Sequence, residues 1–297
     1  MVMELPNVSP SAEATAADAA TSRRIGAILA ADGKLTDRDI ERIVDLQRVR
    51  RIRFGEAAVR LGLISVDDLR RAMAQQYELP HLLPDNARLN RELVVAYEPF
   101  HRCAEEIRAL RTHLLMRWIT GGASARTLAI VSPGPNEGRS YIAANLAVAF
   151  AQLGRRTLLI DADLRRPRQQ RIFGVPDKVG LATVLSGRSD RSAIVPVRDL
   201  GPLSVLPSGA RPPNPVELLS RETFGTLIQE LQTDFDVILF DTPPAQSCAD
   251  AQTVAFRARS ALLIARKDHT RIADTERVVR DISDAGSEIV GTSLNAF

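Results

Sequence analysis

The chain has 297 residues, 45% hydrophobic and 25% charged, which excludes a chain that is disordered throughout. The formal net charge of +3 does not by itself indicate a nucleic-acid polymer as partner, and no apolar run approaches the roughly 18 residues of a membrane span. Two distant cysteines exclude a disulfide framework, and the first twenty residues lack a secretory signal, so we expect a cytoplasmic protein.

Composition divides the chain into four segments. Residues 1–21 are rich in small amino acids and have no periodic pattern of apolar residues, which predicts a disordered tail. Residues 22–80 have the pattern of a small all-α domain, and residues 81–101, with several prolines, that of a linker. Strand and helix patterns alternate over residues 102–297, which predicts an α/β domain with a doubly wound, mostly parallel sheet covered by helices on both faces.

The helical segment contains an internal repeat. The pattern Arg-x-Gly, then Gly, then Gln begins at Arg24 and again at Arg53, 29 positions later. Each unit has a glycine that can end a helix in the left-handed conformation, followed by a Thr or Ser that can cap the next helix, with Asp three residues on. One unit cannot bury its apolar face alone, so we expect the two to stack.

The repeat resembles the N-terminal domain of type II secretion and type IV pilus ATPases, in some of which it binds cyclic di-GMP. Two interpretations stay open. The repeat is either a helical docking module, or a nucleotide site in which Arg pairs with phosphate and the glycines let a ligand approach the backbone. The candidate ligand residues are Arg24, Gly26, Gly33, Gln47, Arg53, Gly55, Gly62 and Gln76.

A strand, a tight loop and a helix follow one another over residues 127–150, the context that a phosphate-binding loop (P-loop) requires. Backbone N–H groups of the loop and the helix N-terminus can face phosphates, and Ser140 can offer its hydroxyl to Mg²⁺. The loop departs from the consensus, because Pro133 replaces the first Gly and Arg139 replaces the Lys. Arg supplies charge but cannot copy a compact ammonium, so we predict nucleotide binding and leave the rate of transfer open.

Carboxylates follow two further apolar strands. Asp161 and Asp163 come directly after one strand, and Asp241 follows another. In a doubly wound sheet these strand ends lie beside the phosphate loop, where a carboxylate can hold Mg²⁺ directly or through water. The sequence therefore predicts a magnesium nucleotide site at this edge of the sheet.

The combined motifs resemble the bacterial tyrosine kinases of polysaccharide export, in particular the chain-length-determinant tyrosine kinases. The resemblance spans residues 102–297 and is carried by residues 132–140, 158–165, 180–187, 206–219, 238–244 and 291–295, together with Glu105-x-x-Arg108-x-x-Arg111.

The resemblance implies roles for the matching residues. The nucleotide would be bound by Pro135, Asn136, Glu137, Gly138, Arg139, Ser140 and Tyr141, with Asn295 at the adenine. Mg²⁺ would be held by Ser140, Asp161 and Asp241, and Arg139 would hold the β- and γ-phosphates. Asp161 would be the base or metal-linked carboxylate that faces the acceptor hydroxyl, with Asp163 and Arg165 supporting it. Glu105, Arg108 and Arg111, three residues apart on one helix, would form a single charged oligomerisation face.

The resemblance also implies ATP and Mg²⁺ as cofactors, a homo-oligomeric ring and a separate membrane-embedded chain-length co-polymerase that holds the kinase at the inner membrane. Only Tyr77, Tyr97 and Tyr141 are present, so we expect no phosphorylation of a C-terminal tyrosine cluster and an acceptor elsewhere. Two alternatives are a catalytically weak nucleotide switch or scaffold gated by cyclic di-GMP, and a partition- or division-type ATPase.

Overall fold

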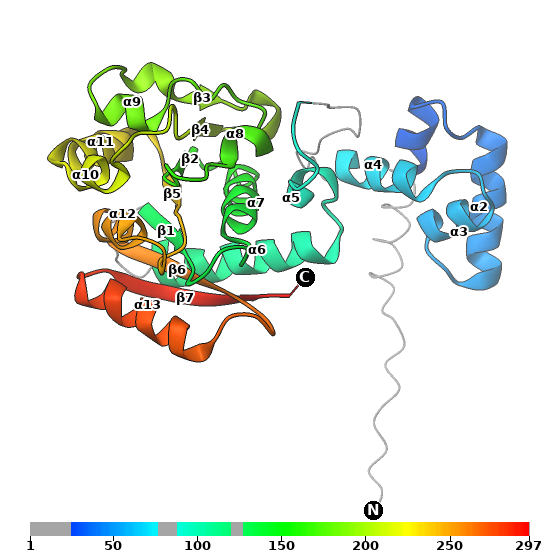
Figure 1. Ribbon diagram of the computed structural model, residues 1–297. Helices are drawn as coiled ribbons and strands as arrows, with labels where there is room; N and C mark the ends of the chain where they lie inside the picture. Colours follow the sequence, from blue (N-terminus) through cyan, green and yellow to red (C-terminus); the bar gives the residue numbers. More distant parts are fainter. Residues whose placement is uncertain (1–24, 77–87, 120–126, 297) are drawn as a thin grey trace, which may run out of the picture. The chain divides into compact units, whose positions relative to one another are not determined.

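The computed structural model describes residues 25–76, 88–119 and 127–296 (Figure 1). The chain forms two compact units, Met1–Leu79 and Pro80–Phe297.

The N-terminal unit is helical in its described residues. Residues 25–31 form a first helix, followed by α2 (Asp37–Arg50), α3 (Phe54–Arg60) and α4 (Val66–Gln76). Their apolar faces meet in one small core, in which Leu29, Ile43 and Phe54 are buried. The two repeats therefore share a core, as the stacking argument predicts.

Both predicted helix caps are present in the N-terminal unit. Asp39 N donates to Thr36 Oγ1 at 3.3 Å while Thr36 N donates to Asp39 Oδ2 at 3.1 Å. Ser65 and Asp68 repeat this reciprocal pair, at 3.0 Å in each direction. The hydrogen bonds from Ser65 lower the pKa of Asp68 to about 2. Asp thus completes a capping box in which Glu or Gln is usual.

The glycines of the repeat serve two different purposes. Gly33 and Gly62 adopt the left-handed conformation at φ +68° and +67°, which confirms their predicted place after a helix end. Gly26 and Gly55 instead lie buried between helices. A Cβ added at Gly55 would lie 2.4 Å from Leu69 Cδ1, and one at Gly26 would lie 3.3 Å from an aromatic ring. The expectation that these two glycines let a ligand approach was wrong, because neighbouring side chains fill that space.

The C-terminal unit is built on one seven-stranded sheet in the order β3-β4-β2-β5-β1-β6-β7. All neighbouring strands are parallel except β3 and β4, which confirms the mostly parallel α/β fold. The strands are β1 (Thr127–Val131), β2 (Thr157–Asp161), β3 (Val195–Pro196), β4 (Leu203–Leu206), β5 (Val237–Asp241), β6 (Ser260–Arg266) and β7 (Glu288–Asn295).

Helices flank this sheet on both faces (Figure 1). The α-helices are α5 (Val94–Tyr97), α6 (Arg102–Leu114), α7 (Arg139–Ala151), α8 (Gln169–Ile172), α9 (Leu181–Leu185), α10 (Pro215–Ser220), α11 (Glu222–Asp234), α12 (Asp250–Ala258) and α13 (Ile272–Asp284). A π-helical turn η1 (Leu115–Ile119) extends α6, and short 3₁₀ turns occupy η2 (Arg191–Ala193) and η3 (Arg198–Leu200).

Each face of the sheet has its own hydrophobic core. One core joins the sheet to α5, α6, α7 and η1, and in it the Trp118 ring packs edge-on against Phe150 at 6.5 Å between centroids. The other core joins the sheet to α9–α13, where Phe224 packs edge-on against Phe240 at 5.9 Å. Every residue of β1, β2 and β5 is buried, as is typical of central parallel strands.

The end of the predicted linker belongs to the C-terminal unit. Residues 88–101 carry α5, and Leu93 and Val95 are fully buried in the core on the α7 face. Asn145 of α7 fixes this segment, because its side chain accepts from Val95 N at 3.1 Å and donates to Glu92 O at 2.8 Å. Proline content alone therefore does not mark these residues as a linker. Within the described ranges, no helix combines the length and hydropathy of a membrane span.

Candidate active site

The phosphate-binding loop connects β1 to α7, with Gly138 as the N-cap of α7 at φ +95°. The buried Glu137 side chain closes this loop: Gly134 N donates to its Oε2 at 2.8 Å, and Thr270 Oγ1 donates to its Oε1 at 2.6 Å. Asn295, at the end of β7, donates from Nδ2 to Glu137 O at 3.2 Å. The loop is thus tied to the segments that follow β6 and end β7.

Arg139 points into the loop that it belongs to. Its side chain is buried, its Nε donates to Thr242 O at 2.8 Å, and its Nη1 donates to Gly134 O at 2.8 Å and to Ser132 Oγ. Burial lowers the pKa of this guanidinium. The sequence predicts that Arg139 contacts phosphate. Its Nε and Nη1 are engaged by the protein, so Nη2, which has no hydrogen-bond partner among the described residues, is the nitrogen left for a phosphate.

Asp161 and Asp241 stand side by side on neighbouring parallel strands and are both completely buried. Burial and the charge of Asp241 raise the pKa of Asp161. Backbone N–H groups hold both oxygens of Asp161, since Oδ1 accepts from Asp163 at 3.2 Å and Oδ2 accepts from Arg168 at 3.0 Å and Gln169 at 2.9 Å. The predicted convergence of these strand ends is present, with Asp161 engaged by its own chain.

Asp241 keeps one oxygen free of protein partners. Gln169 Nε2 donates to Asp241 Oδ2 at 2.8 Å. Burial raises the pKa of Asp241, against the lowering effect of the Arg139 charge and of hydrogen bonds from Gln169 and Ser140. Among the described residues, Asp241 Oδ1 and Gln169 Oε1 are buried without a hydrogen-bond partner. Buried oxygens of this kind fit a hard cation such as Mg²⁺.

The donor set also fits magnesium. In the part of the chain that the structure describes, no three His, Cys, Asp or Glu side chains gather as a metal cage. Mg²⁺ prefers one or two carboxylates completed by waters and substrate phosphates. Asp241 and the Ser140 hydroxyl could supply such a site, with Gln169 beside them. Sequence reasoning missed Gln169, because a polar residue opening a short helix carries no signal until the fold brings it to Asp241.

A cleft of about 770 Å³ opens beside the phosphate loop. It brings together the predicted residues Pro135, Asn136, Glu137, Gly138, Arg139, Ser140, Asp163 and Arg165. Asp163 Oδ1 accepts from the backbone N–H groups of Arg165 at 3.1 Å and Arg166 at 2.8 Å. Asp163 lines the cleft, and Asp161 and Asp241 lie beneath its surface. Tyr141 is half-buried outside the lining, and burial raises the pKa of its hydroxyl to about 12.

Arg165 is held by a second carboxylate that the sequence does not reveal. Its Nε and Nη2 donate to Asp250 at 2.8 and 2.9 Å, and Asp250 is completely buried at the start of α12. Such a two-pronged pair fixes the direction of the guanidinium. The sequence carries no signal for this pair, because Arg165 follows β2 and Asp250 begins α12, 85 positions later.

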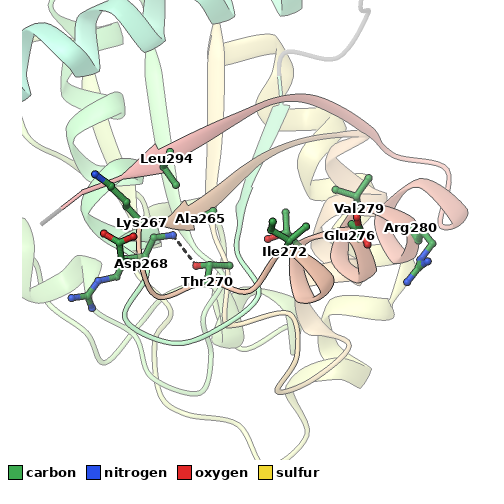
Figure 2. A pocket seen from close by; sticks show the side chains of 11 residues that line it. Ala265, Lys267, Asp268, Thr270, Ile272, Glu276, Val279, Arg280 and Leu294 are labelled. Carbon is green, nitrogen blue, oxygen red and sulfur yellow. Dashed lines mark hydrogen bonds between the residues drawn. The ribbon is translucent and has the colours of Figure 1, made fainter.

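A second hollow, of about 610 Å³, lies between the ends of β6 and β7 and helix α13 (Figure 2). Its exposed apolar residues are Ile272 and Leu294, and Thr270 at its wall accepts from Arg266 N at 2.8 Å. It contains none of the aspartates of the strand ends. Thr270 links this hollow to the phosphate loop, because it also donates to Glu137.

The expected charged face of α6 is largely turned inward. Arg108 donates to Glu105 at 2.7 Å and to Pro99 O, and its side chain is 15% exposed. Arg111 is half-buried and donates to Ala149 O of α7 at 3.0 Å. The expectation of one open charged face on these three residues was wrong, because Arg108 is bonded to Glu105 and to the segment before α6, and Arg111 is bonded to α7. Glu105 remains exposed.

The predicted ligand residues of the repeat are spread over the N-terminal unit. Arg24 lies outside the described residues, and Arg53 is exposed at the N-cap of α3. Gln47 is half-buried. Gln76 is buried, and its Oε1 has no hydrogen-bond partner among the described residues.

No protein-family model matches the chain. The tyrosine-protein kinase YwqD of Bacillus subtilis is 34% identical over 209 residues, which cover 70% of this chain and 87% of that protein. The kinase domain of the Escherichia coli tyrosine kinase ETK aligns with a TM-score of 0.67 and 29% identity over 73% of this chain and 84% of that domain. The septum site-determining protein MinD of Pyrococcus horikoshii OT3, solved with Mg-ADP, aligns at 0.51 and 28% identity over 57% of this chain and 70% of that one.

Proposed function

This chain belongs to the bacterial tyrosine-protein kinases, and we propose that it phosphorylates tyrosines of proteins that polymerise and export an exopolysaccharide. Relatives named CapB and EpsB, and one from a cps region, support this pathway. A neighbour solved with Mg-ADP supports ATP and Mg²⁺ as cofactors. The relatives favour a kinase over a scaffold or a partition ATPase, and the MinD neighbour aligns less well than the kinase domain.

The convergence of Ser140, Asp241 and the phosphate loop at one edge of the sheet carries the proposal. Loop amides and Arg139 would bind the β- and γ-phosphates, and Ser140 and Asp241 would hold Mg²⁺, which neutralises charge on the phosphates when bound. The tyrosine oxygen forms a bond to the γ-phosphorus while the bond from that phosphorus to the β,γ-bridging oxygen breaks. The resemblance implies that Asp161 takes the phenol proton. Both oxygens of Asp161 are engaged by backbone N–H groups and Asp163 lines the cleft, so we assign the proton to Asp163, with Asp161 and Arg165 as its support.

The test is transfer from ATP labelled at the γ-phosphate to tyrosine, measured with the full chain and with its co-expressed membrane partner. We expect the wild type to form phosphotyrosine. Asp241→Asn should lower the rate of phosphate transfer at least about a hundredfold, as the removal of a group that stabilises charge does in other enzymes. Arg139→Lys serves as a matched control, because it restores the usual residue. No labelling by the wild type under conditions in which Arg139→Lys transfers phosphate would refute the kinase proposal.

We propose cyclic di-GMP as an effector of the N-terminal unit. The unpartnered Gln76 Oε1 and the exposed Arg53 support it, and a duplicated unit suits a ligand with two-fold symmetry. Calorimetry on the full chain should show heat of binding that Arg53→Ala removes. The control is Arg60→Ala, which loses only an exposed pair with Glu56. A flat titration of the wild type would reject cyclic di-GMP binding.

We propose that a separate membrane-embedded chain-length co-polymerase recruits this kinase to the inner membrane as a homo-oligomeric ring. Glu105, which stays exposed on α6, would contribute to the ring. Light scattering of the full chain with the partner's cytoplasmic segment should show an oligomer that Glu105→Lys dissociates. If the wild type and the variant formed complexes of the same mass, this face of α6 would be excluded as a contact in the ring.

A further inference from the structure

The cleft beside the phosphate loop concentrates positive charge. Seven cationic and three acidic side chains line it, an excess larger than the net charge of +3 of the whole chain. A concave surface with one sign of charge focuses the electrostatic field and attracts ligands of the opposite sign. The cleft therefore favours anionic ligands beyond what the composition suggests.

Three of the seven cations are engaged by the protein itself. Arg139 donates into the phosphate loop, and Arg165 is paired with buried Asp250. Arg168 Nη2 donates to both carboxylate oxygens of Glu92 at 2.8 and 2.9 Å. These three side chains are therefore held by groups of the protein itself.

The other four cations are exposed and have no ion pair or side-chain hydrogen bond with any described residue. Arg156, by comparison, is exposed and pairs with Asp236 at 2.9 Å. We call the four the cationic rim; they are Arg166, Arg171, Lys178 and Arg211.

A smaller hollow of about 430 Å³ adjoins the rim and shares Arg165 and Arg211 with the cleft. Its remaining lining consists of Pro212, Pro213 and Pro215. Proline rings are rigid and apolar, and a guanidinium attracts the face of an aromatic ring. The hollow can therefore receive an aromatic side chain next to the cations.

Other anionic ligands fit this surface less well. The phosphates of ATP have the loop amides and Arg139 as partners, and none of these groups belongs to the cationic rim. A bilayer is flat on this scale, whereas these cations surround a concavity. Single-stranded nucleic acid is bound with aromatic stacking platforms, and no aromatic side chain is among the described residues that line the cleft.

We propose that the cationic rim binds acidic residues that flank the acceptor tyrosine, so that this kinase selects acidic, tyrosine-containing segments of other polypeptides. The proposal rests on the kinase function proposed above. Clusters of basic residues recognise acidic motifs by this kind of complementarity, which acts mainly on association and specificity.

Binding separates this proposal from the kinase proposal. Three fluorescent peptides with a central Phe, which cannot be phosphorylated, carry Glu, Ser or Lys on both sides and are titrated with the full chain by anisotropy. We expect the Glu peptide to bind about tenfold more tightly than the Lys peptide at low salt, since several exposed pairs each contribute modestly, and the gap should shrink as salt increases. Tyrosine versions of the peptides, with ATP, should follow the same order in kcat/KM.

Reversing the charge of two rim residues tests whether the preference for the Glu peptide comes from the rim. Arg171→Glu with Lys178→Glu should reverse the preference and leave binding of the Ser peptide unchanged. The matched control is Arg198→Glu with Arg277→Glu, which changes the net charge equally at exposed positions outside the cleft. The control should keep the wild-type preference.

The outcomes are distinct. Discrimination in binding without phosphorylation of any tyrosine peptide would support the rim and refute the kinase function. Equal binding of the three peptides, or the same change in both double variants, would overturn the rim proposal. A membrane role is tested with vesicles that contain anionic lipid. If these vesicles displaced the Glu peptide from the wild type while the three peptides bound equally, the surface would be assigned to a membrane, and the rim proposal would be overturned.

Discussion

Replacing Thr270 by Val tests the link between the phosphate loop and the segment after β6. The change keeps the shape of the side chain and removes the hydroxyl that donates to Glu137 Oε1 at 2.6 Å. Glu137 is buried, so this oxygen loses its neutral donor without gaining water. Hydrogen bonds to charged groups contribute about 1.5–3 kcal/mol, and we expect a loss of about 2 kcal/mol in the free energy of unfolding.

The assay is urea unfolding followed by fluorescence of Trp118, the single tryptophan of the chain, which is buried in the core of the C-terminal unit. A loss of about 2 kcal/mol raises the unfolding constant about 30-fold. Weaker ATP binding should accompany it, because Glu137 also holds Gly134 N of the loop.

Thr275→Val is the matched control, since this hydroxyl donates only to the carbonyl of Arg271 on its own helix at 3.2 Å. We expect it to change the unfolding free energy by less than about 0.5 kcal/mol. If Thr270→Val and Thr275→Val changed stability and ATP affinity equally, the proposed closure of the loop by Glu137 would be refuted.

Three further predictions concern single sites. Gln169→Leu leaves the buried Asp241 Oδ2 without its amide donor, so it should cost about 1–3 kcal/mol of stability and weaken Mg²⁺-dependent ATP binding, measured by calorimetry; unchanged Mg²⁺ dependence would contradict the assignment. Gly55→Val places a side chain against a leucine at 2.4 Å and should destabilise the N-terminal unit by about 1–3 kcal/mol in circular dichroism melts, whereas a neutral result would contradict the packing. Because the folded pKa of Asp68 is about 2, below the ordinary value of 3.8, its contribution to stability is present above about pH 4 and lost as the pH falls towards 2; Ser65→Ala should reduce that acid-dependent loss, seen as a flatter pH titration of helix content.

The sequence carries local information about the site but not the partners that the fold supplies. Asp161 and Asp241 could be placed together because the carboxyl ends of parallel strands meet at one edge. Their adjacency on β2 and β5 depends on a strand order in which β5 lies between β1 and β2, and this order has no local signal. The inward turn of Arg139 depends on the carbonyl of Thr242, which is 103 positions away.

The same distinction holds for the helices. The caps at Thr36 and Ser65 were predicted correctly, because a cap is a contact between residues three positions apart. Spacing also places Arg108 and Arg111 on one side of α6, but it cannot tell whether that side faces solvent or α7. Residues 88–101 belong to the predicted linker and contain Pro99, yet they fold because their apolar side chains pack in a core formed by distant segments.

The bond from Arg111 to Ala149 O has a consequence for assembly. It joins α6 to the last turns of α7, the helix whose first residue follows the phosphate loop. A neighbouring protomer that drew the Arg111 guanidinium away from α7 would break this bond and loosen the far end of α7. Ring formation and nucleotide occupancy would then be thermodynamically linked, and each would change the free energy of the other by the same amount.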